Sequence, residues 1–92
     1  MKIVRRTTQF KKDFKRYKLQ PDKLESLLAV IRMLENDIEL PEIYQQHPLK
    51  GKYQGCLECH VAGDFLLIWI DEKNNIIELV RLGSFRTFWI AL

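Results

Sequence analysis

The pattern of hydrophobic positions divides the chain into a helical first part and a strand-forming second part. The segment from Lys2 to Arg5 contains one apolar pair and predicts a short strand. Thr7 or Thr8 can cap a helix that should run to about Leu19, where a Gln-Pro pair follows. Three aromatic residues recur at the spacing of one face of this helix: Phe10, Phe14 and Tyr17.

A second helix is predicted directly after the Gln-Pro pair. Asp22 followed by Glu25 has the form of a capping box, with Asp in place of Ser or Thr. The helix should end near Asn36, and its apolar stripe consists of Leu24, Leu27, Leu28, Ile31 and Leu34. Two consecutive helices with one apolar face each predict a helical hairpin whose stripes belong to the core.

The second half of the chain predicts strands. Residues 57–61 alternate between apolar and polar side chains, which predicts one buried and one polar face. The continuous apolar run at 65–70 is typical of a central strand covered on both sides. A third strand is predicted over 76–82, and the apolar tail 87–92 is a candidate for a last one. The fold predicted is α+β, with an N-terminal strand and a two-helix hairpin packed on a three- to four-stranded, mainly antiparallel sheet.

Length and composition predict one globular domain over residues 1–92, with 47% hydrophobic and 29% charged residues. No stretch has the length and hydrophobicity of a signal peptide or a bilayer span, so we expect a cytoplasmic protein with reduced cysteines and no membrane partner. The net charge is +3, and basic residues crowd the first part of the chain: Lys2, Arg5, Arg6, Lys11, Lys12, Lys15, Arg16 and Lys18. Such a run fits a nucleic-acid or acidic-protein partner, and it is equally typical of a solvated helix face.

Candidate chemistry gathers at residues 47–64, where the helical part meets the strands. Residues 56–60 match C-x-x-C-H, the attachment pattern of c-type haem. In an alternating strand, however, Cys56 and Cys59 point to opposite faces, so they cannot converge on haem or on zinc. We therefore expect no haem, metal or other cofactor, and we interpret Cys59 as a small core residue.

His47 and His60 are the only histidines of the chain. His60 lies on the polar face of its predicted strand, and Asp64 follows across a tight turn, where a carboxylate can orient an imidazole. Such groups can serve as general base and general acid in RNA cleavage without a metal, although each histidine alone is also typical of a structural role. Three cations could hold the scissile phosphate: Lys50, Lys52 and Arg81.

Several linked segments share the order and spacing of one known family. They read FKKDFKR at 10–16, HPLKGKY at 47–53, ECHV at 58–61 with Asp64 after it, LLIW at 66–69 and RLGS at 81–84. Together with the two-helix segment, they cover the whole chain. The sequence resembles the YafQ branch of the RelE/ParE toxin superfamily.

The resemblance implies the toxin of a bacterial type II toxin–antitoxin pair, which cleaves mRNA in the ribosomal A site without a metal. The implied partners are a cognate antitoxin, the ribosome and mRNA, with operator DNA contacted only through the antitoxin. By motif, His47, His60 and Asp64 take the places of catalytic or activity-sensitive residues. Arg81 would contact phosphate, and Trp89 falls near the C-terminal aromatic residue of the family.

Position 85 departs from the family pattern, which has a catalytic histidine after the Gly-Ser pair. This chain has Phe85, whose side chain can stack on an unpaired base but has no group to titrate. Two functions stay open. One is an mRNA endoribonuclease that its remaining histidines sustain, or that Phe85 weakens or inactivates. The other is a non-cleaving protein of the same fold that acts with its antitoxin, for example in operon repression.

Overall fold

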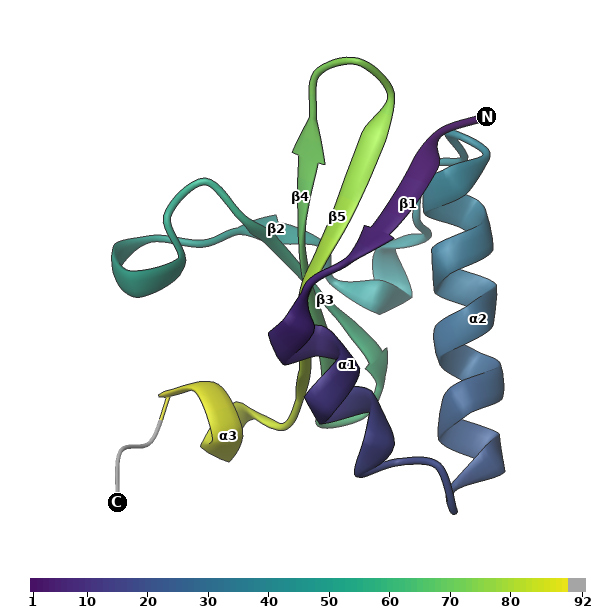
Figure 1. Cartoon of the computed structure of the whole chain (residues 1–92), viewed down its shortest axis with the longest axis vertical. Helices are drawn as coiled ribbons and strands as arrows, with labels where there is room; N and C mark the ends of the chain where they lie inside the picture. The colour runs from purple at the N-terminus through teal and green to yellow at the C-terminus, as the bar shows by residue number, and fades with distance from the viewer. Residues whose placement is uncertain (90–92) are drawn as a thin grey trace.

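The computed structural model describes residues 1–89 and arranges them around one five-stranded sheet (Figure 1). The strands are β1 (Ile3–Arg6), β2 (His47–Pro48), β3 (Leu57–Ala62), β4 (Phe65–Glu72) and β5 (Ile76–Gly83). Their order across the sheet is β1-β5-β4-β3-β2. β1 runs parallel to β5, and every other neighbouring pair is antiparallel. The α+β class and the predicted strands 57–61, 65–70 and 76–82 are confirmed. The sheet is larger than expected, because β1 joins one edge and the two-residue β2 joins the other.

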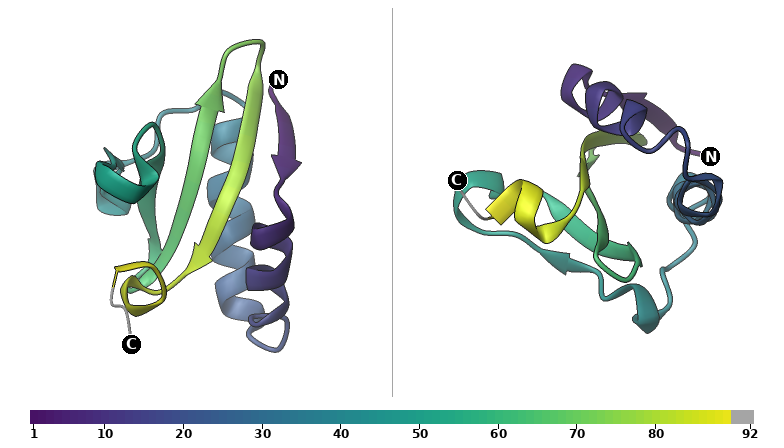
Figure 2. Two further views of the ribbon diagram at one scale, coloured as in Figure 1. Left: turned by 60° about the vertical axis from the view of Figure 1, so that its left-hand side comes forward. Right: turned by 90° about the horizontal axis from the view of Figure 1, so that it is seen from below.

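Two helices cover one face of this sheet, and a third segment covers the opposite face (Figure 2). Helix α1 (Thr8–Lys15) packs against β5, and α2 (Pro21–Glu35) packs against β3. Helix α1 ends four residues before the predicted Leu19, because residues 16–19 continue as turns. None of the helices within residues 1–89 has the length and apolar character that a bilayer span requires.

Two details of the predicted second helix are wrong. Because α2 begins at Pro21, Asp22 lies inside its first turn, and no side-chain cap forms at its start. A capping box centred on Asp22 is therefore absent from this helix. Leu28 was expected in the core stripe but is 49% exposed, whereas Val30 is fully buried. The helix is thus rotated slightly relative to the face that the leucine spacing alone suggests.

The two faces of the sheet have separate hydrophobic clusters. The cluster under α1 and α2 includes Phe10, Leu27, Val30, Leu67 and Trp69. The outer cluster includes Cys56, Leu66, Ile68 and Phe88. Alternate residues of β4 enter the two clusters, so the prediction of a central strand covered on both faces is confirmed.

The outer cluster is covered by helix α3 (Phe85–Trp89) and by the 3₁₀ turn η2 (Gly51–Tyr53), which we call the η2 lobe. The prediction of a strand in the tail is wrong for residues 87–89, and residues 90–92 lie outside the described part. Two contacts start the helix: the Ser84 hydroxyl accepts from the Thr87 N–H, and the Asp64 carboxylate accepts from the Phe85 N–H at 3.1 Å. At Gly83, an added Cβ would lie 3.3 Å from the Phe88 ring, so the helix returns closely over the end of β5.

The two cysteines lie on opposite faces, as the strand pattern predicts. Cys56 belongs to the outer cluster and Cys59 to the cluster under the helices. Both thiols are buried and free. Their separation across the sheet removes the geometric basis for a shared haem or zinc ligand at residues 56–60.

A threonine cap is expected to stabilise the junction of α1 with β5. The Thr7 hydroxyl accepts from the Phe10 N–H at 3.0 Å and donates to the Val80 carbonyl at 3.1 Å. Thr7→Ala should lower the free energy of unfolding by about 1–2 kcal/mol, measured by urea denaturation. Thr8→Ala changes the exposed neighbour and should shift it by less than about 0.5 kcal/mol. Equal losses in the two variants would contradict the capping role.

A buried thiol should make stability fall at alkaline pH. Burial raises the pKa of Cys59 from about 9 to about 12. Above pH 9 the unfolded chain therefore binds fewer protons than the folded chain, so the free energy of unfolding should fall as pH rises towards 12. Urea denaturation of the native protein and of Cys59→Ala between about pH 8 and 11.5 tests this. Other groups titrate similarly in both proteins, so a profile that is not flatter in Cys59→Ala would refute the assignment.

Candidate active site

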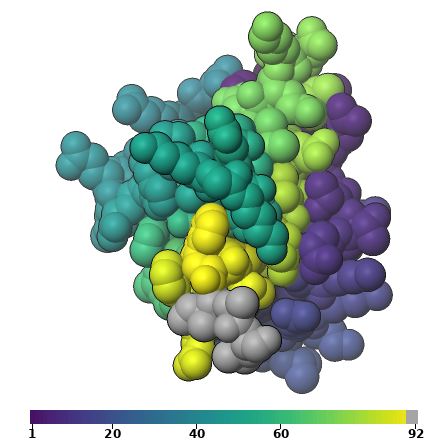
Figure 3. Space-filling model, turned by 90° about the vertical axis from the view of Figure 1, so that its left-hand side faces the viewer, coloured from purple at the N-terminus to yellow at the C-terminus, as the bar shows by residue number. Residues whose placement is uncertain are grey.

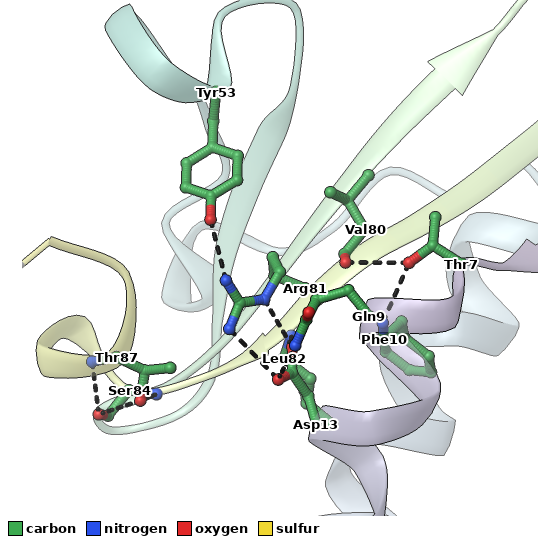
Figure 4. Close-up of polar contacts among 10 residues, drawn as sticks. All are labelled: Thr7, Gln9, Phe10, Asp13, Tyr53, Val80, Arg81, Leu82, Ser84 and Thr87. Atoms are coloured by element: carbon green, nitrogen blue, oxygen red, sulfur yellow. Dashed lines mark hydrogen bonds and ion pairs between the residues drawn. The ribbon is translucent and has the colours of Figure 1, made fainter.

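A buried carboxylate holds Arg81 near the end of β5 (Figure 4). The Arg81 Nε donates to Asp13 Oδ2 at 2.8 Å, and Nη2 donates to Asp13 Oδ1 at 3.2 Å. The Asp13 side chain has no exposed surface, and it also accepts from the Leu82 N–H at 3.0 Å and from the Gln9 amide at 3.1 Å. Helix α1 is thus joined to β5 through one fully bonded carboxylate.

The opposite side of the Arg81 guanidinium faces the outer cluster. Its Nη1 donates to the Tyr53 hydroxyl at 3.1 Å, and its Cζ lies 5.1 Å from the centre of the Phe88 ring. The hydrogen bonds to Asp13 raise the pKa of Arg81 above its ordinary value. Among residues 1–89, three of the five guanidinium N–H donors have partners, so a phosphate would have to bind the other two. Arg81 is a fixed cation rather than the free one that its sequence position suggests.

His47 lies on β2 between two acceptors. Its Nδ1 donates to the Gln45 carbonyl at 2.7 Å, and its Nε2 lies 3.1 Å from Glu58 Oε1. His47 thus has a carbonyl oxygen at one ring nitrogen and a carboxylate oxygen at the other. Glu58 is only 5% exposed, and its second oxygen accepts from the Trp89 indole at 3.4 Å. Glu58 therefore links the β2 histidine to α3. The predicted polar face of β3 is wrong at this residue, because α3 folds over it.

His60 lies near His47, with 6.5 Å between the ring centres. Its Nδ1 donates to the Gly63 carbonyl at 3.1 Å, and in the neutral tautomer that this bond selects, Nε2 carries the lone pair. The expectation that Asp64 orients His60 is wrong. A bulge between His60 and Ala62 and the left-handed Gly63 direct a backbone carbonyl to the ring, while Asp64 binds the Phe85 N–H.

The remaining predicted residues lie around these groups. Lys50 and Lys52 are exposed on or beside the η2 lobe, and Phe85 is 52% exposed at the start of α3. Tyr53 packs edge-on against Phe88 and Trp89, which joins the η2 lobe to α3 (Figure 3). The Lys52 Nζ lies 5.4 Å from the centre of the Tyr53 ring, and Tyr53 contacts Arg81, so these three residues and the aromatic residues of α3 lie together near the end of β5. The two histidines lie on β2 and β3, at the side of the sheet opposite β1. Glu58 links His47 to α3.

Three contributing residues were missed from the sequence. Asp13 had a visible signal, because position 13 falls inside the apolar helix face defined by Phe10, Phe14 and Tyr17. Tyr53 and Glu58 lie inside the quoted segments HPLKGKY and ECHV, but nothing in the sequence indicates their contacts with α3. Within residues 1–89, no group of three or more His, Cys, Asp or Glu side chains is placed to hold a metal ion.

Solved bacterial toxins share this fold. A metal-bound toxin from Helicobacter pylori superposes with a TM-score of 0.87 at 33% identity, covering 97% of this chain and 100% of that one. YafQ from Escherichia coli strain BL21(DE3) has the same fold, with a TM-score of 0.85 at 24% identity, covering 97% of this chain and 99% of that one. The chain thus has the fold of the RelE-like toxins.

Sequence comparison identifies the family to which the chain belongs within the RelE-like toxins. The family model described as bacterial toxin of type II toxin-antitoxin system, YafQ, matches residues 2–89. The mRNA interferase toxin YafQ of Escherichia coli strain K12 is 35% identical over 80 residues, which are 83% of each chain. The putative toxin YafQ of Haemophilus influenzae is 36% identical over 59 residues, or 61% of this chain and 58% of that protein. This chain belongs to the YafQ family of type II toxins, as the sequence motifs indicate.

Removing the buried carboxylate should strongly destabilise the protein. Asp13→Ala leaves Arg81, which is 17% exposed, without its ionic partner, and should lower the free energy of unfolding by about 3 kcal/mol or more. Asp22→Ala removes an exposed acid from α2 and serves as the control in urea denaturation. Replacing both partners by apolar residues, as in Asp13→Leu with Arg81→Met, should recover much of the loss. A loss in Asp13→Ala no larger than in the control would contradict this account.

Proposed function

We propose that this toxin is a ribosome-dependent mRNA endoribonuclease in which His47 and His60 share proton transfer. The observation that carries the proposal is the proximity of two differently held imidazoles, 6.5 Å apart. His60, held at Nδ1 by the Gly63 carbonyl, would be the general base that takes the proton of the 2′-hydroxyl at Nε2. His47, held between the Gln45 carbonyl and Glu58, would be the general acid that protonates the leaving 5′-oxygen. This division of roles requires no metal.

The scissile phosphate would lie where the remaining Arg81 donors meet the exposed lysines of the η2 lobe. Arg81 keeps its charge and orientation through Asp13, which suits a group that stabilises charge developing on phosphate. Lys50 and Lys52 would add flexible cations. Phe85 would stack on an unpaired base, and Trp89 would hold Glu58 in place beside His47.

The partners proposed for this chain are those that membership of the YafQ family suggests. Escherichia coli YafQ has been solved in complex with the antitoxin DinJ, and we propose a cognate antitoxin for this chain. Operator DNA would be contacted only through that antitoxin. The exposed lysines of α1, among them Lys11, Lys12 and Lys15, would face ribosomal RNA, since basic side chains that neutralise phosphates supply much of the affinity for nucleic acid.

A second function is favoured by one observation at position 85. Phe85 is half-exposed at the start of α3, and its apolar side chain cannot transfer a proton. A toxin that has lost cleavage at this position would still fold and bind its antitoxin. We therefore retain a non-cleaving binding protein, acting with its antitoxin in operon repression, as the alternative.

Expression in growing bacteria with mapping of mRNA 5′ ends separates the two functions. The nuclease should arrest growth and produce cuts at ribosomal A sites. His60→Ala or His47→Ala should each reduce cutting by about 10²- to 10⁴-fold, the usual contribution of a general acid or base. Phe85→His should increase cutting, whereas Phe85→Leu, which adds no titratable group, should not.

Each outcome has a distinct meaning. Cutting only after Phe85→His would support the non-cleaving alternative for the native chain. Undiminished cutting by His60→Ala in an active background would remove His60 from the mechanism. If neither the native chain nor Phe85→His cuts RNA, the nuclease proposal fails.

A further inference from the structure

A pocket of about 270 Å³ opens beside His60, at the end of β3 that extends beyond its pairing with β2. One wall is the 3₁₀ turn η1 (Glu42–Tyr44) with the residue after it, and the other is the end of β3 and its turn. The side chains that matter here are Ile43, which is 78% exposed, Tyr44 and Gln45. All seven lining residues are neutral or histidine, so the walls themselves do not repel a phosphate chain.

The walls of this pocket also hold both candidate catalytic imidazoles. The Gln45 carbonyl accepts from His47 Nδ1 at 2.7 Å, and the Gly63 carbonyl accepts from His60 Nδ1 at 3.1 Å. Both wall residues adopt the left-handed conformation, with φ of 51° at Gln45 and 55° at Gly63. For a glutamine this conformation is strained, because its Cβ approaches the backbone too closely. The strained backbone at Gln45 therefore aims its carbonyl at His47 from the wall of the pocket.

We propose that this pocket binds one nucleobase of the RNA substrate, next to the phosphate that the two histidines act on. The inference rests on the proposed nuclease function and specifies its substrate contact. Ile43 and the Tyr44 ring offer an apolar surface to the face of a base, and the Gln45 amide offers both a donor and an acceptor to its edge. The volume is below the usual range of roughly 300–1,000 Å³ for drug-sized ligand pockets, which suits a single base.

The lining favours a base over an apolar side chain of a protein partner. An aliphatic side chain would cover Gln45 and His60 without satisfying their hydrogen bonds, which is unfavourable. A base satisfies them along its edge while its face contacts Ile43. Because Gln45 and Gly63 bond to the two imidazoles, an occupied pocket would also fix both rings, which couples base recognition to proton transfer.

Titration by NMR tests the site without requiring cleavage. The four nucleoside 3′-monophosphates are added to the native chain, with ribose 5-phosphate as the base-free control. At least one nucleotide should shift the Ile43 methyl and the Gly63 amide together with both histidine ring signals. Ribose 5-phosphate can bring only its phosphate to the histidines, so it should leave the Ile43 methyl and the Gly63 amide unshifted. Ile43→Ser should weaken this binding by about tenfold, in line with the loss of an apolar contact to the base. Ile38→Ser changes another exposed isoleucine, outside this pocket, and should alter binding by less than about twofold.

Three results would overturn the assignment. They are equal shifts with ribose 5-phosphate, nucleotide shifts confined to Lys50 and Lys52, and no pocket shift up to about 20 mM nucleotide. Base binding without any RNA cleavage would refute the nuclease proposal and leave the pocket assignment intact. RNA cleavage without base binding would refute the pocket assignment and leave the nuclease proposal intact.

Discussion

The buried carboxylate of Asp13 is the constraint on which the rest of the arrangement depends. A fully buried charge is tolerated only when it is paired and hydrogen-bonded, and Asp13 accepts from Arg81, Leu82 and Gln9. Because α1 carries the acid and β5 carries its partners, the helix can dock on the sheet in only one register. A buried ion pair seldom adds net stability over apolar packing, so its evident contribution here is geometric: it fixes the direction of a cation at the edge of the candidate site.

Around that cation, the site is assembled from segments that are far apart in the chain. Tyr53 from the η2 lobe completes the Arg81 contacts, and the same ring packs against α3. Glu58 joins His47 on β2 to Trp89 on α3. The short β2 and α3 have little structure of their own to hold them, and these side-chain contacts place them. The geometry of the candidate site therefore depends on each of these side-chain contacts.

The features predicted from the sequence are mainly those that the spacing of apolar and polar residues determines. The aromatic stripe of α1, the central strand β4 and the opposite faces of Cys56 and Cys59 follow from spacing, whereas the stripe of α2 does so only in part, because Leu28 is exposed and Val30 is buried. The family follows from linked motifs. The two-residue β2 has no period to detect, and the parallel pairing of β1 with β5 joins segments about seventy residues apart. The tail looked like a strand because its residues are aromatic and apolar, whereas Asp64 and Ser84 cap it as a helix. Glu58 lies at a position of polar parity and is buried only because that helix folds over it.

The pairing of β1 with β5 also governs when the protein can fold. The first strand of the chain has its sheet partner in the last strand, and Asp13 finds Arg81 only when β5 has been synthesised. Such long-range contacts raise the contact order and delay the completion of folding. During translation the N-terminal strand and α1 must wait, without their partners, for nearly the whole chain to emerge. The toxin can therefore complete its fold only after the ribosome has synthesised β5, close to the end of translation.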